Sequence, residues 1–422
     1  MSKSAMGSIA SAIASRTSSP PRRATSQSWH SAMRGRVAWM LGLSTIACSQ
    51  GMGCRWALGG CMPEPWAQNT LGLDYRAEAE LLGEPTEPII DVHTHINGGR
   101  AAEIWADAAS RFGVSMTYTQ TVLEEAPAVR DALGDRARFI AIPDYMAEDK
   151  KHAFTEGYVE RIKIWHGEYG ARMLKFWQAP RLRDYMEDQD AIDALALDGP
   201  WKRKIVELAN ELGMMIMTHI ADPDTWFTAK YTDVSAYGTK AQQYEPLERM
   251  LDEYPQTQWL AAHMGGYPEN LEFLSGLLER HDNLSLDTSA CKWQVRELSK
   301  HPRDKLLAFF NRWKGRILFG SDIVARDEHL VESDDVQYAA GQAACPEQAF
   351  ELYASRYYAL RTMFETDYEG KSPIADPDLA MVEPDKFDEM SSPMLIGKSL
   401  PPEILTDMYS HAVGRVVARH YR

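Results

Sequence analysis

Cysteine is scarce in this sequence, because its 422 residues include only five. Cys48, Cys54 and Cys61 fall in the first 61 residues, which leaves Cys291 and Cys345 for the rest of the chain. Two cysteines cannot supply the several disulfides that hold a small secreted domain together. The chain must therefore rely on a hydrophobic core, and it is long enough to bury a sizeable one.

Lys and Arg are outnumbered by Asp and Glu beyond the N-terminal segment. The formal net charge is -15, yet residues 1–61 contain seven Lys or Arg and no Asp or Glu, so residues 62–422 carry a net charge seven units more negative. Proteins that bind nucleic acid use clustered positive charge to neutralise phosphates. The acidic composition argues against a nucleic acid partner, and we expect a small-molecule substrate.

The uncharged stretch near the N-terminus, "VAWMLGLSTIA" (37–47), is too short for a comfortable membrane span. It follows Arg34 and Arg36 in the order of a secretory signal, and "LGGC" (58–61) resembles a bacterial lipoprotein cleavage box with Cys61 as the lipidated residue. Residues 34–61 therefore predict an exported or lipid-anchored bacterial protein. The alternative is a disordered tail, a true start at Met33 and a cytoplasmic protein.

We expect three parts: a signal-like or disordered N-terminal segment (1–61), a polar linker (62–86) and one large domain (87–422). In that domain, strand-like apolar runs alternate with segments of helical periodicity. The eight runs are 88–96, 115–122, 138–145, 172–177, 214–220, 257–265, 284–290 and 316–322, and clear helical patterns cover 201–213, 245–255 and 270–281. This alternation predicts an α/β fold with parallel strands, and eight units have the size of a (β/α)8 TIM barrel. A doubly wound open sheet is less favoured, because no glycine-rich dinucleotide fingerprint follows the first strand.

The connections after the fourth, fifth and eighth strands are longer than a barrel needs, for example 178–199 and 221–243. Such extended βα loops would lie over the C-terminal end of the barrel as lids or specificity loops. They hold several aromatic residues that either form a wall for a flat substrate or pack as small cores of their own: Trp177, Trp226, Phe227, Tyr231 and Tyr237. By contrast, we expect the aromatic residues at helical spacing in 354–366 to pack against the barrel.

Residues of metal-binding type recur at the ends of the predicted strands. His93 and His95 lie two residues apart, so they project from the same face of the first strand. In a barrel the later strand ends would join them: Lys175, His219, His263, Asp287 and Asp322. Convergent imidazole and carboxylate groups suit a metal ion, so the set predicts a metal site.

The motifs around these residues resemble the amidohydrolase superfamily and, within it, the amidohydrolase-related family that includes aminocarboxymuconate semialdehyde decarboxylase. The matching pieces span about 88–417: "DVHTHI", "THIADP", "AHMGGYPENL", "LDTSA", "FGSD" and "LPPEILTDMYSHAVGRVV". One departure is Ser410-His411-Ala412, where the family usually has Gly-Asn-Ala.

The resemblance implies that His93, His95, His219 and Asp322 hold one divalent metal ion, with zinc preferred, and that His263 orients or polarises the substrate. Three imidazoles and a carboxylate leave an open position for water. The resemblance leaves Lys175 ambiguous. It is either an ordinary strand-four lysine or, if carboxylated, a bridge to a second metal ion. Asp91 is a candidate to orient a histidine or, equally, to bind backbone at the strand end.

The site serves two reactions. The first is hydrolysis of an amide, ester or lactone of a small organic acid by metal-activated water, with Asp322 and His263 as catalytic residues. The alternative is metal-dependent non-oxidative decarboxylation, and a third reading is an inactive metal- or ligand-binding protein. Weaker candidates for binding a substrate carboxylate or its ring are Arg100, Trp177, Arg181, Arg183, Trp226 and Arg326. Analogy with the resembling family also suggests a homodimer.

Overall fold

A computed structural model describes residues 66–186, 188–331 and 342–421. The chain divides into two units, residues 1–62 and 63–422, and every feature given below belongs to the second. The predicted signal-like segment and Cys61 lie outside the described residues, so the predictions about export, lipid anchoring and cleavage stay predictions. Among the described residues, none of the helices combines the length and the apolar character needed to cross a membrane.

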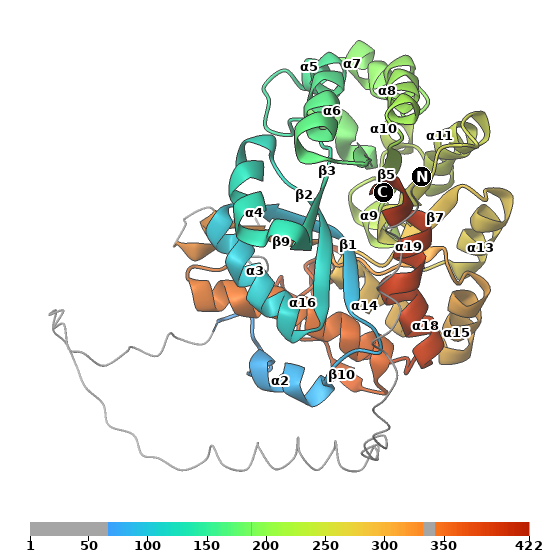
Figure 1. Ribbon diagram of the computed structural model, residues 1–422. Coiled ribbons are helices and arrows are strands. Elements are labelled where there is room, and N and C mark those ends of the chain that lie inside the picture. Colours follow the sequence, from blue (N-terminus) through green and yellow to red (C-terminus); the bar gives the residue numbers. More distant parts are fainter. Residues whose placement is uncertain (1–65, 187, 332–341, 422) are drawn as a thin grey trace, which may run out of the picture. The chain divides into compact units, whose positions relative to one another are not determined.

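Strands β1 to β9 form two parallel sheets, and helices connect most of the successive strands (Figure 1). The first sheet has the order β3-β2-β1-β9 and the second has the order β4-β5-β6-β7-β8. Their bounds are β1 Ile89–Asn97, β2 Val114–Gln120, β3 Ala137–Ile140, β4 Met173–Gln178, β5 Met215–Ile220, β6 Trp259–Ala261, β7 Leu284–Asp287, β8 Ile317–Leu318 and β9 Ile323–Arg326. The predicted α/β class with parallel strands is confirmed.

Backbone hydrogen bonds connect the two sheets on both sides. Next to β3 and β4, Ala141 pairs with Leu174, and the amide of Lys175 donates to the carbonyl of Ala141 over 2.9 Å. On the other side β8 and β9 are consecutive in the chain, and the amide of Val92 in β1 donates to the carbonyl of Phe319 over 2.9 Å. This continuity fits the predicted (β/α)8 arrangement.

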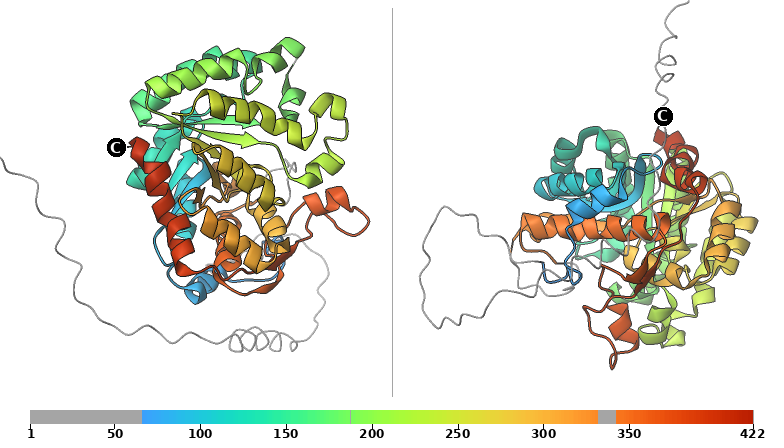
Figure 2. Two further views of the ribbon diagram at one scale, coloured as in Figure 1. Left: turned by 90° about the vertical axis from the view of Figure 1, so that its right-hand side faces the viewer. Right: turned by 90° about the horizontal axis from the view of Figure 1, so that it is seen from below.

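The helices lie outside the strands, as Figure 2 shows in two further views. The three segments with predicted helical periodicity are confirmed as α8 Pro200–Glu211, α11 Lys240–Glu253 and α13 Leu271–Arg280. The other helices are α2 Tyr75–Leu82, α3 Gly99–Arg111, α4 Ala126–Leu133, α5 Lys150–Phe154, α6 Glu156–Tyr169, α7 Gln189–Ala194, α9 Asp224–Ala229, α10 Val234–Tyr237, α12 Ala262–Gly265, α14 Cys291–Lys300, α15 Arg303–Arg312, α16 Pro346–Glu365, α17 Asp378–Val382, α18 Pro402–Thr406 and α19 Ala412–Val416. A short antiparallel pair, β10 Glu369–Lys371 and β11 Met394–Ile396, precedes α18.

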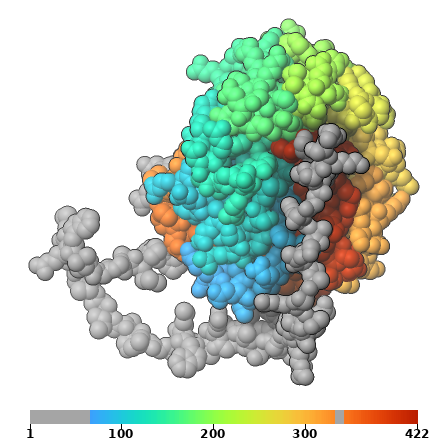
Figure 3. All heavy atoms as spheres, viewed as in Figure 1, coloured from blue at the N-terminus to red at the C-terminus, as the bar shows by residue number. Residues whose placement is uncertain are grey.

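Two layers of apolar side chains make up the core. The larger layer fills the space between strands and helices, and it includes the aromatic face of α16, whose Tyr357 and Phe364 are fully buried as the spacing predicts. The smaller layer joins strand residues such as Val92 and Met217 to residues of α19 and the segment after it. Figure 3 shows this C-terminal segment in red, between the cyan and the yellow parts of the chain.

The segment that we expected to be a linker contains helix α2. Asp74 begins this helix by accepting hydrogen bonds from the amides of Arg76 and Ala77. Tyr75 is 2% exposed and its ring meets that of Tyr358 edge-on at 5.9 Å. Residues 75–82 are therefore packed against the domain and do not form a polar linker.

Two strands end earlier than their sequences predict. The sixth was expected to reach residue 265, but β6 ends at Ala261, because His263 and Met264 have φ of 60° and 52°. The eighth was expected to run unbroken over 316–322, but it is interrupted before Asp322, which has φ of 59°. A left-handed residue cannot continue a strand, so the chain turns at both places.

Candidate metal centre

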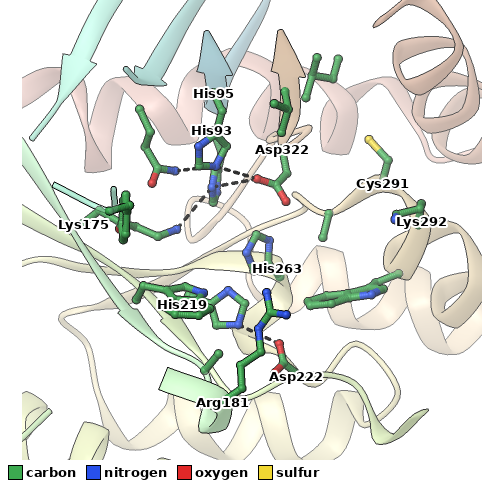
Figure 4. A pocket seen from close by; sticks show the side chains of 18 of the residues that line it. His93, His95, Lys175, Arg181, His219, Asp222, His263, Cys291, Lys292 and Asp322 are labelled. Atoms are coloured by element: carbon green, nitrogen blue, oxygen red, sulfur yellow. Dashed lines mark hydrogen bonds and ion pairs between the residues drawn. The ribbon is translucent and has the colours of Figure 1, made fainter. Parts of the chain in front are cut away.

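A cavity of about 810 Å³ opens where the strands of both sheets end. The structure brings six of the predicted site residues to its wall, as Figure 4 shows: His93, His95, Lys175, His219, His263 and Asp322. These side chains come from β1, β4, β5, the turn after β6 and the break between β8 and β9. Residues that are more than 200 positions apart in sequence therefore share one cavity.

Three of these side chains converge most closely. The Oδ1 atom of Asp322 lies 3.1 Å from Nε2 of His95 and 3.4 Å from Nε2 of His93. The ligand atoms of the three residues all fall within 4.8 Å of one another. Because β9 pairs with β1 beside this point, the left-handed turn at Asp322 aims its carboxylate at the two histidines. Two imidazoles and a carboxylate are a donor set that suits a divalent metal ion.

The other ring nitrogen of His93, Nδ1, contacts Asp287 and Ser289. Asp287, at the end of β7, places Oδ2 3.0 Å from Nδ1 of His93, and the hydroxyl of Ser289 lies 3.0 Å from the same nitrogen. Burial would raise the pKa of Asp287, but the charge and hydrogen bond of His93 outweigh it, so its pKa lies below the ordinary value. An ionised carboxylate at Nδ1 keeps the proton there and leaves Nε2 as the metal-facing lone pair.

His263 shares the same partners. Its amide donates to Oδ1 of Asp287 over 2.8 Å, and its Nδ1 lies 2.8 Å from the hydroxyl of Ser289. The centre of its ring lies 5.0 Å from that of His93 and 5.6 Å from that of Trp293, whose ring is nearly perpendicular to it. Burial is the main reason why its pKa lies well below the ordinary histidine value. His263 is therefore a fixed, neutral imidazole beside the three converging residues.

Among the described residues, two sets of side chains have ligand atoms close enough to share a metal ion: His93, His95 and Asp322, and His93, His263 and Asp287. His219 lines the same cavity but belongs to neither set. Its Nε2 is 2.9 Å from Oδ1 of Asp222, and its ring centre is 4.8 Å from that of His263.

A Cβ atom at Gly266 would collide with the carbonyl oxygens of Ile220 and Ala221, so only glycine lets the turn after β6 pack this closely on the end of β5.

Lys175 is 3% exposed, and its Nζ lies 3.4 Å from Nε2 of His93. Burial lowers the pKa of this amine to about 8, although the negative charges of Asp322 and Asp287 act in the opposite direction. Part of the lysine is thus neutral near neutral pH, which is the form that can react with carbon dioxide to give a carboxylated lysine.

The predicted substrate contacts separate into two groups. Arg181 reaches into the cavity, with its guanidinium 5.4 Å from the ring of Trp177 and 5.1 Å from that of Trp226, and all three residues line the wall. The other arginines do not line the cavity. Arg100 is exposed on α3, Arg183 donates to the carbonyl of Ala236, and Arg326 donates to Nε2 of His329.

The other aromatic residues of the loop after β5 pack on each other. The loops therefore both line the cavity and form a small core of their own, which were the two alternatives that the sequence left open. Tyr231 meets Phe227 at 5.1 Å and Tyr237 at 5.0 Å. Trp177 and Trp226 alone, among the five aromatic residues singled out from the sequence, line the cavity.

Asp91 binds backbone and hydroxyl groups and no histidine ring. It accepts hydrogen bonds from the amides of His93 and Ser321 and from the hydroxyls of Ser321 and Tyr357. Of its two proposed roles, the strand-end role is the one that the structure shows. Sequence reasoning did not single out Ser289, Asp222 or Trp293. The first two follow a strand-end Asp or His by two or three positions, which is the signal that would have found them.

These observations describe a metal-dependent enzyme with its site at the strand ends. The chain belongs to the amidohydrolase family: the model of this family, described as amidohydrolase, matches residues 76–409, which is most of the chain. The protein is thus a metal-dependent hydrolase or decarboxylase.

Two solved structures illustrate the matches that a structural comparison gives. One is 5-carboxyvanillate decarboxylase from Novosphingobium aromaticivorans, complexed with manganese and 4-hydroxy-3-methoxy-5-nitrobenzoic acid, with 11% identity over 66% of this chain and 96% of that chain and a TM-score of 0.34. HMG-CoA lyase from Bacillus subtilis has 13% identity over 66% and 94%, with a TM-score of 0.34. These scores are too low to support any argument about this chain. No curated protein matches the sequence.

Proposed function

We propose that the protein is a zinc-dependent hydrolase that cleaves an amide, ester or lactone of a small organic acid within a closed (β/α)8 barrel. The observation that carries the proposal is the position and charge of Asp322, which faces His93 and His95 across the cavity. Burial would raise the pKa of Asp322, but its interactions with the neighbouring rings of His263, His95 and His93 outweigh burial, so its pKa lies well below the ordinary value. A carboxylate that stays ionised suits a general base.

A zinc ion held by His93, His95, His219 and Asp322 would supply a Lewis acid and lower the pKa of water near the substrate carbonyl. Asp322 then accepts a proton from the attacking water and returns it to the leaving group. His263, fixed through Ser289 and Asp287, would contact the substrate beside the metal ion and orient it. The walls formed by Trp177 and Trp293 exclude bulk water from the reacting atoms.

Decarboxylation remains the second candidate, because Arg181 supports it. This guanidinium lies between two indole rings at the cavity wall, where it suits a carboxylate attached to a flat conjugated group. Decarboxylation, however, also needs a proton donor at the carbon that loses carbon dioxide. Among the described residues, Asp322 and His263 at the cavity wall are the candidates for this donor.

The deciding experiment incubates the purified, zinc-loaded protein with matched pairs of substrates, each pair being an aromatic or enol acid and the corresponding amide, ester or lactone. We expect ring opening or amide and ester cleavage without release of carbon dioxide. Release of carbon dioxide from the free acids alone would replace the hydrolase by the decarboxylase. Zinc binding without turnover of either set would favour a binding protein that has lost catalysis.

We propose one zinc ion per chain, and Lys175 tests this count. In Lys175→Ala and in the wild type, elemental analysis is expected to find one equivalent of zinc, because the converging atoms of His93, His95 and Asp322 form the zinc site without Lys175. Lys292→Ala, which also removes an amine from the cavity wall, is the matched control. Two equivalents in the wild type that fall to one or none only in Lys175→Ala would instead establish a carboxylated lysine that bridges two metal ions.

A further inference from the structure

The loop that follows β5 reaches back to a histidine of the metal site. Building on the proposed function, we propose that Asp222 is a positioning residue: it holds Nε2 of His219 so that Nδ1 is the nitrogen left for the metal ion, and the loop thereby sets metal affinity. Nothing in the sequence motifs or in the family match assigns a role to this aspartate. Figure 4 shows the ring of His219 between Asp222 and His263.

The contact between the two side chains is short and shielded from water. Oδ1 of Asp222 lies 2.9 Å from Nε2 of His219, and the two residues are 2% and 6% exposed. A carboxylate accepts only, so this geometry requires the proton on Nε2 and leaves the lone pair on Nδ1. A buried carboxylate at one ring nitrogen also makes the other nitrogen a stronger ligand.

The backbone between the two residues is shaped for this contact. Ala221 has φ of 57°, a left-handed conformation that is unfavourable for a residue with a side chain. The turn at Ala221 brings the carboxylate of Asp222, only three residues further on, back to the ring of His219. Ala221 lies between β5 and α9 and belongs to neither. We therefore attribute its left-handed conformation to the contact between Asp222 and His219.

The loop itself is anchored at two further points. The hydroxyl of Tyr231 donates to Oδ2 of Asp222, so both oxygens of the carboxylate are held. Nε1 of Trp226 donates to Oδ2 of Asp378 over 3.0 Å, and Asp378 also pairs with the buried Arg296 at 3.1 Å. Asp222 is thus presented to His219 by a fixed loop, which is what orientation of a metal ligand requires.

The test measures metal binding directly, with zinc and cobalt as probes. Asp222→Asn should weaken zinc binding 10- to 100-fold in competition with a chromophoric chelator, because an amide no longer enforces one histidine tautomer. The visible absorption of the cobalt-loaded variant should also change, because the ligand environment changes. Tyr231→Phe removes the hydroxyl that supports Asp222 and should weaken zinc binding several-fold. It also keeps the test decisive if Asp222→Asn does not fold.

Two matched variants separate this role from general damage to the loop. Asp224→Asn changes an exposed aspartate of α9 that pairs with Lys240, and Tyr237→Phe removes a hydroxyl that donates to Asp184. Both should bind zinc as the wild type does. Unchanged zinc affinity and an unchanged cobalt spectrum in Asp222→Asn and Tyr231→Phe would overturn the positioning role while the proposed enzyme stands. Absence of zinc binding in the wild type would overturn the proposed function itself.

Discussion

Asp322→Asn is expected to lower kcat by roughly 1,000-fold on any substrate that the wild type turns over. The substitution removes both the base that accepts a proton and the negative charge that faces His93 and His95. An amide has nearly the same shape, so the turn at Asp322 and its backbone hydrogen bond to the carbonyl of His93 should persist. Steady-state kinetics with excess zinc, together with the zinc content of the variant, measure the effect.

The matched control is Glu328→Gln, which neutralises an exposed carboxylate in the same segment of the chain. It should leave kcat and zinc content unchanged. A kcat for Asp322→Asn within tenfold of the wild type would show that another group accepts the proton, and the role assigned to Asp322 would have to be given up.

Lys202→Met is expected to stabilise the protein by roughly 4 to 5 kcal/mol at pH 6.5. Lys202 in α8 is 1% exposed, and its Nζ lies 4.5 Å from the centre of the Phe176 ring. No hydrogen bond or ion pair to it occurs within the part of the chain that the structure describes. Burial lowers its pKa from the ordinary 10.5 to about 7. Methionine fills similar space without carrying a charge into the core.

The effect has a definite dependence on pH. Because the folded pKa is the lower one, the unfolded chain binds more protons between pH 7 and pH 10.5, and the cost of burying Lys202 falls as the pH rises through this window. Urea unfolding of wild type and variant should therefore differ most at pH 6.5 and by less than about 1 kcal/mol at pH 10. Lys204→Met is the control, since Lys204 also lies 4.5 Å from a ring, that of Trp201, but is exposed. A pH-independent difference would contradict the explanation.

The sequence predicts the alternation of strands and helices well, because each element carries its own hydrophobic period. In α8, for example, Ile205, Val206 and Ala209 form the buried stripe that the pattern requires. The pattern does not report where a strand is interrupted by one left-handed residue. His263 and Asp322 are not glycines, and their φ values are imposed by tertiary packing around the cavity. For the same reason α2 was missed, because its burial depends on α16, which is remote in sequence.

In the candidate site, the sequence predicts the strand-end residues but not the residues that hold them in place. Strand-end position places His93, His95, His263 and Asp322 at the cavity, because the ends of parallel strands meet on one side. The partners of their second ring nitrogens come from other strands and loops, so no local pattern reveals them. Ser289 serves both His93 and His263, although it lies 196 and 26 residues away from them. Arg100 shows the converse, because proximity in sequence to His95 does not bring it into the cavity.

The hydrogen bonds between Asp91 and Ser321 have a consequence for the order of folding. They join residues separated by 230 positions, and closing a loop of that length costs roughly 5 kcal/mol of chain entropy. Contacts of this kind form after local ones, so the pocket beside them is completed late, when the first and last strands of the parallel sheets have met. Tight metal binding would then require that the whole domain has folded. A substitution far from the site that increases the fraction of partly folded chains would therefore weaken metal binding.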